Sequence, residues 1–168
     1  IGYRSMYGDF GAADVNDCIS IGTSSLRGIL TTAASGTVAI GTSALRAITS
    51  GAANTAVGYS ALKGISTGSG NIAIGYNALL TSTLGESNNI AIGRDAMKLA
   101  NDGAGGHAQN IAIGSYVLDG VTGNTITDTV AIGHNAMTAT PYENGTVAIG
   151  SSALAALISG EKNTAIGY

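Results

Sequence analysis

One short motif recurs along the whole chain. The segment Thr37-Val-Ala-Ile-Gly-Thr-Ser-Ala-Leu45 returns with substitutions, for example as Asn71-Ile-Ala-Ile-Gly-Tyr-Asn-Ala-Leu79. Its glycine always follows Ile or Val, and Leu or Met stands four residues later in every complete copy. A period of 17 to 21 residues indicates a repeat architecture in which each copy buries its apolar face against the next. The anchor glycines are Gly2, Gly22, Gly41, Gly58, Gly75, Gly93, Gly114, Gly133, Gly150 and Gly167.

The composition excludes several other classes of protein. With 45% hydrophobic residues and a net charge of −3, the chain has the apolar content that disordered chains lack. One Pro and no strict Gly-X-Y period exclude collagen. The mild negative charge gives no reason to expect nucleic acid, and no apolar run is long enough for membrane insertion.

The spacing within each motif predicts an all-β fold. In Thr-Val-Ala-Ile-Gly, Val and Ile alternate with Ala and Gly at the period of a β-strand. A helix is the weaker alternative, because glycine interrupts each short stretch. We therefore expect a parallel β-solenoid or β-roll, with one coil per 17–21 residues and two strands of about five residues in each coil. The second strand would carry the Ala-Leu of each motif.

Residues 1–168 form a single array of about nine repeats. Neither end carries the polar capping unit that a free-standing solenoid needs, so we expect an excerpt of a longer fibre protein.

Each strand is expected to have one large and one small apolar face. We expect the large side chains to fill the coil core, together with the Leu column. The small face would then be an oligomer face, because a second surface at close approach explains why larger residues are missing there. The expected core residues are Ile21, Ile40, Val57, Ile74, Ile92, Ile113, Ile132, Ile149, Leu45, Leu62 and Leu79; the expected oligomer face comprises Ala39, Ala56, Ala73, Ala91, Ala112, Ala131 and Ala148.

An asparagine recurs four residues before the anchor glycine. Stacking would align these side chains in a structural ladder of amide hydrogen bonds, with a turn preference and no ladder as the alternative. The ladder residues are Asn54, Asn71, Asn89, Asn110 and Asn163.

Tyrosines and basic residues recur after the anchor glycine. Tyr59 and Tyr76 directly follow it, and they are candidates for a glycan contact, although stacking between rungs is the favoured interpretation. Four of the seven basic residues stand five positions after the glycine, where they would form a broken column. That column suits acidic glycans, but a solvated charge that discourages aggregation is favoured.

The sequence offers no catalytic, cofactor-binding or metal site. The acids form no paired column, and His107 and His134 lie in different repeats. We therefore expect a protein that is not an enzyme and that has no cofactor.

At the level of Asn71–Leu79, the motif resembles the head repeats of trimeric autotransporter adhesins, and more closely the Asn-Thr-Ala-Ile-Gly-Tyr-x-Ala-Leu arrays of bacteriophage tail fibres. The resemblance covers essentially the whole chain. It implies a homotrimeric fibre, intertwined or laterally packed, on the extracellular surface or the virion. Such a module mediates attachment or spaces a receptor-binding tip, with cell-surface glycans as candidate partners. The alternative is a monomeric β-solenoid that binds a polysaccharide or another extended ligand through one flat face.

Overall fold

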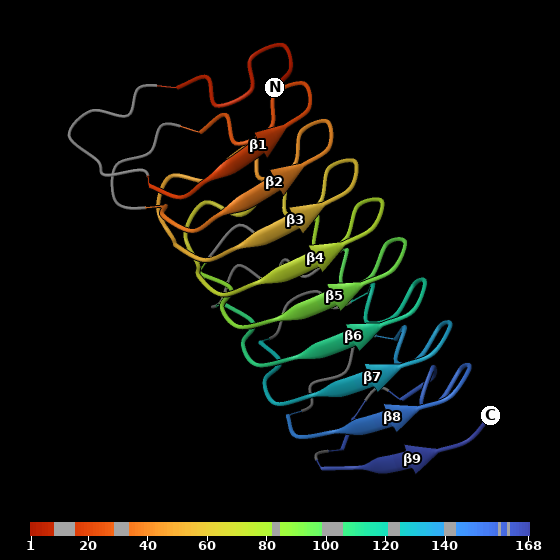
Figure 1. Ribbon diagram of the computed structural model, residues 1–168. Coiled ribbons are helices and arrows are strands. Elements are labelled where there is room, and N and C mark those ends of the chain that lie inside the picture. Colours follow the sequence, from red (N-terminus) through yellow and green to blue (C-terminus); the bar gives the residue numbers. More distant parts are fainter. Residues whose placement is uncertain are drawn as a thin grey trace.

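Each repeat contributes one short β-strand, and the strands stack in sequence order along a rod (Figure 1). The computed structural model describes residues 1–8, 16–28, 34–81, 85–98, 106–120, 125–139, 144–157, 159–160 and 162–168. Within these residues there are nine strands of three residues and no helix: β1 (Ile19–Ile21), β2 (Val38–Ile40), β3 (Thr55–Val57), β4 (Ile72–Ile74), β5 (Ile90–Ile92), β6 (Ile111–Ile113), β7 (Val130–Ile132), β8 (Val147–Ile149) and β9 (Thr164–Ile166).

The strands form one parallel sheet in which every strand pairs with the equivalent strand of the next repeat. The order is β1 to β9 without a crossover, and the register places motif on motif, as in Ala56 opposite Ala73. The anchor position continues the ladder, because the Gly75 N–H donates to the Val57 carbonyl at 2.8 Å. These pairings confirm a parallel β-solenoid.

The second strand expected for each coil is absent from the described residues. After the anchor glycine the chain reverses direction, with the Ala61 N–H reaching back to the Gly58 carbonyl at 3.4 Å. The residues two and four positions after the glycine then adopt left-handed backbone, as at Ser60 (φ 56°) and Leu62 (φ 51°). Left-handed residues interrupt an extended chain, so the Ala-Leu segment is a stack of turns that closes the coil behind the sheet.

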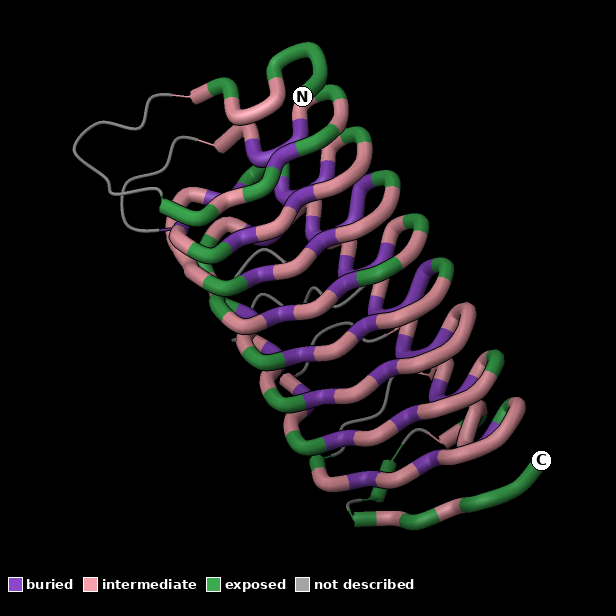
Figure 2. Tube along the Cα trace, in the orientation of Figure 1, coloured by how far each residue is buried: buried purple, intermediate pink, exposed green. Residues whose placement is uncertain are grey.

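The sheet faces the coil interior with its alanines, which corrects the expected core and the expected oligomer face. From β2 to β8 the central Ala is fully buried, whereas Ser20 takes this place in β1 and Ala165 of β9 is half-buried. The flanking Ile, Val and Thr residues are half-buried or exposed (Figure 2), so they lie on the outward side of the sheet. The residues wrongly placed in the core are Ile21, Ile40, Val57, Ile74, Ile92, Ile113, Ile132 and Ile149; those wrongly placed on an outer face are Ala39, Ala56, Ala73, Ala91, Ala112, Ala131 and Ala148.

The physical reason for this orientation is the narrow interior of the coil. The Leu or Met column of the rear wall is fully buried, as expected for Leu45, Leu62 and Leu79. These long side chains fill the space between the two walls, so that only a small side chain fits opposite them on the strand. Their burial explains why bulky residues hold left-handed backbone, which otherwise costs about 1–2 kcal/mol per residue.

Candidate interaction surfaces

The outward face of the sheet is a continuous apolar surface. Of the eighteen outward positions in the nine described strands, sixteen are Ile or Val and two are Thr. Ile21 and Ile74 have 43% and 39% of their surface exposed. A sheet with one solvated face normally carries polar residues on that face. We call this surface, made of the first and third residue of β1 to β9, the outward apolar face.

The asparagine ladder is confirmed over four consecutive rungs, Asn54, Asn71, Asn89 and Asn110. In each step the side-chain oxygen of one Asn accepts hydrogen bonds from both the main-chain N–H and the side-chain amide of the next. For Asn54 and Asn71 both distances are 3.0 Å. Each side-chain amide also donates to a carbonyl of the following coil, as from Asn71 to Glu86 at 2.7 Å. The remaining steps repeat this geometry.

The ladder ends where threonine replaces asparagine. The Thr129 N–H donates to the Asn110 side chain at 3.1 Å, but a hydroxyl cannot carry the amide pattern to the next rung. In the described part of the chain, the Oγ1 atoms of Thr37 and Thr146 are buried without a hydrogen-bond partner. Asn163 lies two threonine rungs beyond Asn110, and its amide donates to the Gly160 carbonyl at 2.7 Å.

Extending the ladder by one rung is expected to stabilise the protein. In the variant Thr37→Asn, the new side-chain oxygen would accept hydrogen bonds from the main-chain N–H and the side-chain amide of Asn54. The new side-chain nitrogen would donate to the Gly51 carbonyl, just as the Asn54 amide donates to the Gly68 carbonyl one coil further on. We expect the free energy of unfolding to rise by about 1 kcal/mol, measured by urea denaturation. Thr42→Asn, at an exposed corner, is the control and should have no effect. A lower free energy of unfolding in Thr37→Asn would contradict the expectation that the ladder stabilises the protein.

An aromatic and cationic column runs along the corner that follows the strands. The rings of Tyr59 and Tyr76 stack with centroids 5.4 Å apart and planes at 11°. The Arg94 guanidinium lies 5.6 Å from the Tyr76 centroid and 5.9 Å from that of Tyr116. Tyr116 in turn meets His134 edge-on at 6.2 Å. Five side chains from successive rungs thus form one continuous stack.

The stack limits how much of the Tyr59 and Tyr76 rings a glycan could contact. Both side chains are about half exposed, at 53% and 48%. Tyr76 has Tyr59 on the preceding rung and Arg94 on the following one, so mainly its edge faces solvent. A sugar ring packs against the face of an aromatic ring, and at Tyr76 that face is already used. The glycan contact stays a prediction, and Tyr59 is the better placed of the two residues.

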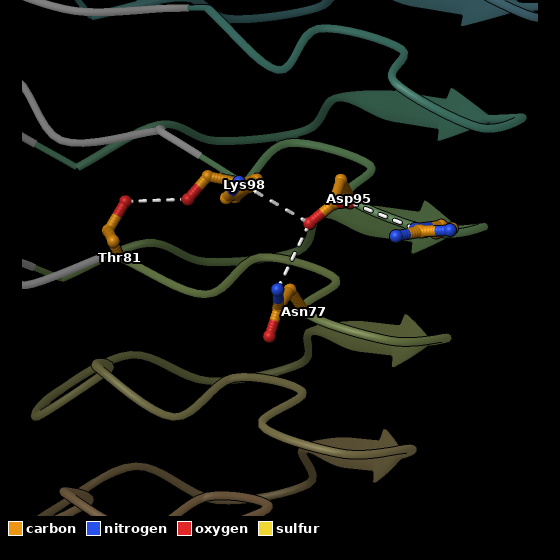
Figure 3. Close-up of polar contacts among 5 residues, drawn as sticks. Asn77, Thr81, Asp95 and Lys98 are labelled. Carbon is orange, nitrogen blue, oxygen red and sulfur yellow. Dashed lines mark hydrogen bonds and ion pairs between the residues drawn. The ribbon is translucent and has the colours of Figure 1, made fainter.

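Asp95 forms the centre of a polar network on the same corner (Figure 3). Its carboxylate accepts from the Asn77 amide at 3.1 Å and from Arg94 Nε at 3.4 Å, and it lies 3.6 Å from Lys98 Nζ. The Asp95 side chain is only 5% exposed, so these donors compensate its burial. On the next rung, burial raises the pKa of the Asp119 carboxyl, an effect that Lys98 partly opposes.

The sequence motif did not reveal this network. The network is formed by Arg94, Asp95 and Asn77, whose positions hold other residues in most repeats. The consensus of the motif therefore does not predict it. Aligning the repeats by register places Asn77 beside Asp95 and would have indicated the contact.

The histidines occupy separate environments. His107 is fully buried, and its Nδ1 accepts from the Ile126 N–H at 3.0 Å. His134 lies on the exposed corner. The described residues contain no group of three or more His, Cys, Asp or Glu side chains that could hold a metal ion.

No family model matches the chain, and no curated protein or solved structure shows a significant similarity to it. In the part of the chain that the structure describes, no helix is long and apolar enough to cross a membrane. The features on which a function can rest are therefore the surfaces described above. They offer apolar packing, stacked hydrogen bonds and exposed charge.

Proposed function

We propose that the chain is a non-enzymatic structural module of an extracellular or virion surface fibre, assembled from several copies of itself. It mediates attachment or spaces a receptor-binding tip. The observation that supports this proposal is the outward apolar face, which runs the length of the rod. Burying an Ile or Val side chain contributes about 1.5–3 kcal/mol, and this face presents two such columns to a partner of matching shape.

We propose a second copy of the same chain as that partner, and a homotrimer in which three outward apolar faces meet along a common axis. A straight sheet of Ile and Val fits another sheet with the same rung spacing, because side chains of equal periodicity can interdigitate along the full length. The number three rests on the resemblance to trimeric adhesin heads and tail fibres. The proposed interface therefore consists of the outward isoleucines and valines, and not of the alanines, which are inside the coil.

Lysine on the outward apolar face is expected to separate the copies without unfolding the coil. We expect light scattering to give a mass of three chains for the unmodified protein across a dilution series. The double variant Ile92→Lys and Ile132→Lys should give a mass of one chain, because assembly would bury unpaired charges. Both side chains are partly solvent-exposed in the single chain, so its β-sheet circular dichroism should remain.

Thr42→Lys, at the exposed corner that follows β2 and outside the outward apolar face, serves as the matched control and should keep the mass of the unmodified protein. A single-chain mass for the unmodified protein would overturn self-association and favour the monomeric solenoid. Retention of the full mass by the double lysine variant would move the interface to another face.

A further inference from the structure

The charges of this chain are segregated along its length. From Cys18 to Gly85 there are three basic residues, Arg27, Arg46 and Lys63, and neither Asp nor Glu. All ten acidic residues lie before or after this segment. One part of the rod is thus purely cationic, although the whole chain carries a net charge of −3.

The fold aligns these three cations in one column. The Leu26 N–H donates to the Ala44 carbonyl, and the Leu45 N–H donates to Ala61 in the same way. This register sets the residues that follow Leu26, Leu45 and Leu62 one above another on successive rungs. Rungs are about 4.8 Å apart, so the basic stripe, defined as Arg27, Arg46 and Lys63, spans roughly 10 Å.

Nothing in the described part of the fold neutralises the basic stripe. Its three side chains make no ion pair with a described residue, whereas Lys98, in the same column two rungs further on, lies 3.6 Å from Asp95. Like charges on neighbouring rungs repel each other. The stripe therefore opposes stacking of the coils, and an external anion would remove that repulsion.

The basic stripe also lies on a wall that the proposed assembly leaves open. It follows the reverse turn after each anchor glycine, so the chain has already left the sheet and runs behind it (Figure 1). Arg46 is exposed, and Arg27 and Lys63 are partly exposed. A second copy packed on the outward apolar face would leave this rear wall in solvent.

We propose that the basic stripe binds an anionic polysaccharide lying along the rod. A linear chain with regularly spaced carboxylate or sulfate groups can follow a straight row of cations, and neutralising them releases condensed counterions. Grooves that bind single-stranded nucleic acid carry aromatic side chains on which the bases stack, and the stripe contains none. The rest of the chain has more acidic than basic residues, which also disfavours a nucleic acid as the ligand. This proposal gives the proposed fibre a ligand. It rests on the proposed function in one respect only: the rear wall must remain exposed to solvent in the assembled fibre.

Binding is tested with immobilised chain and three probes: dextran sulfate, polygalacturonate and neutral dextran. We expect the two anionic probes to bind at low salt, the neutral one not to bind, and affinity to fall as salt rises. The triple variant R27Q/R46Q/K63Q should lose about tenfold or more in affinity. R4Q/K162Q removes exposed basic residues outside the stripe and should retain most of the binding.

Absence of binding to both anionic probes at low salt would overturn the proposal, as would equal losses in R27Q/R46Q/K63Q and R4Q/K162Q. A single-stranded oligonucleotide that binds as tightly as the polysaccharides would overturn the ligand class. Light scattering on the same samples keeps the two proposals apart, because a monomer that binds refutes the fibre alone, and a trimer that does not bind refutes the stripe alone.

Discussion

Replacing the anchor glycine Gly75 by alanine is expected to destabilise the coils around it strongly. Gly75 has φ +137°, a backbone conformation that side chains of L residues rarely adopt. A Cβ atom there would clash with the Gly93 carbonyl oxygen of the next rung. That oxygen belongs to the backbone, so it cannot move without breaking the stack. The strained backbone costs about 1–3 kcal/mol, and overpacking costs about 1–3 kcal/mol more.

The control for this substitution is Gly36→Ala. Gly36 also has positive φ, at +68°, but a Cβ there meets nothing within 4 Å. We expect Gly36→Ala to lower the free energy of unfolding by about 1 kcal/mol and Gly75→Ala to lower it by about 4 kcal/mol, both from urea denaturation followed by circular dichroism. Similar losses in the two variants would mean that the close approach of the rungs at Gly75 does not limit the stack.

The recurrence of the motif was sufficient to predict the architecture. The strands fall on the Val-Ala-Ile or equivalent triplet of each motif, and the pairing follows the repeat because equal sequences reach the lowest energy in the same register. The Ala-Leu half of each coil was predicted as a strand, and this was wrong. Ser60 and Leu62 adopt left-handed backbone, which neither residue type signals, since leucine is rarely found there.

The inside and outside of the sheet could not be assigned from the strand pattern. Alternation at period two separates Ala56 from its neighbours Thr55 and Val57, but it does not say which face is enclosed. The decisive quantity is the interior volume, set by the opposite wall. With Leu62 filling that space, the strand can place only a small side chain there. The Leu column is correctly predicted as core, but the space that it leaves for the facing strand does not follow from the strand pattern.

The asparagine ladder could be predicted because its column is uniform. Asn71 and Asn89 carry the same residue on neighbouring rungs, so stacking alone implied their hydrogen bonds. The Arg94 and Asp95 contacts were missed because they depend on different residues meeting across rungs. Such contacts follow from the register of the individual coils, which insertions of variable length between motifs obscure in the linear sequence.

Replacing Asn71 by aspartate is expected to destabilise the ladder more than removal of one hydrogen bond would. The Asn71 amide donates to the Asn54 side chain at 3.0 Å and to the Glu86 carbonyl at 2.7 Å. An aspartate has the same shape but presents oxygen to both acceptors. Asn71 is fully buried, so the new charge would have no solvent. It would face the two acceptor oxygens, and only the N–H groups of Asn89 would still donate to it. An uncompensated buried charge costs about 3–5 kcal/mol.

Asn88→Asp is the matched control, because Asn88 is exposed on the neighbouring coil and has the left-handed φ of 58° that aspartate tolerates. We expect Asn71→Asp to lower the free energy of unfolding by about 4 kcal/mol at pH 7 and Asn88→Asp to leave it nearly unchanged, measured by urea denaturation. Acidification should restore part of the loss in Asn71→Asp, because protonation removes the charge and supplies one donor. A loss that is equal at both pH values would show that charge burial is not its cause. The loss would then come from the missing amide hydrogen bonds to Asn54 and Glu86.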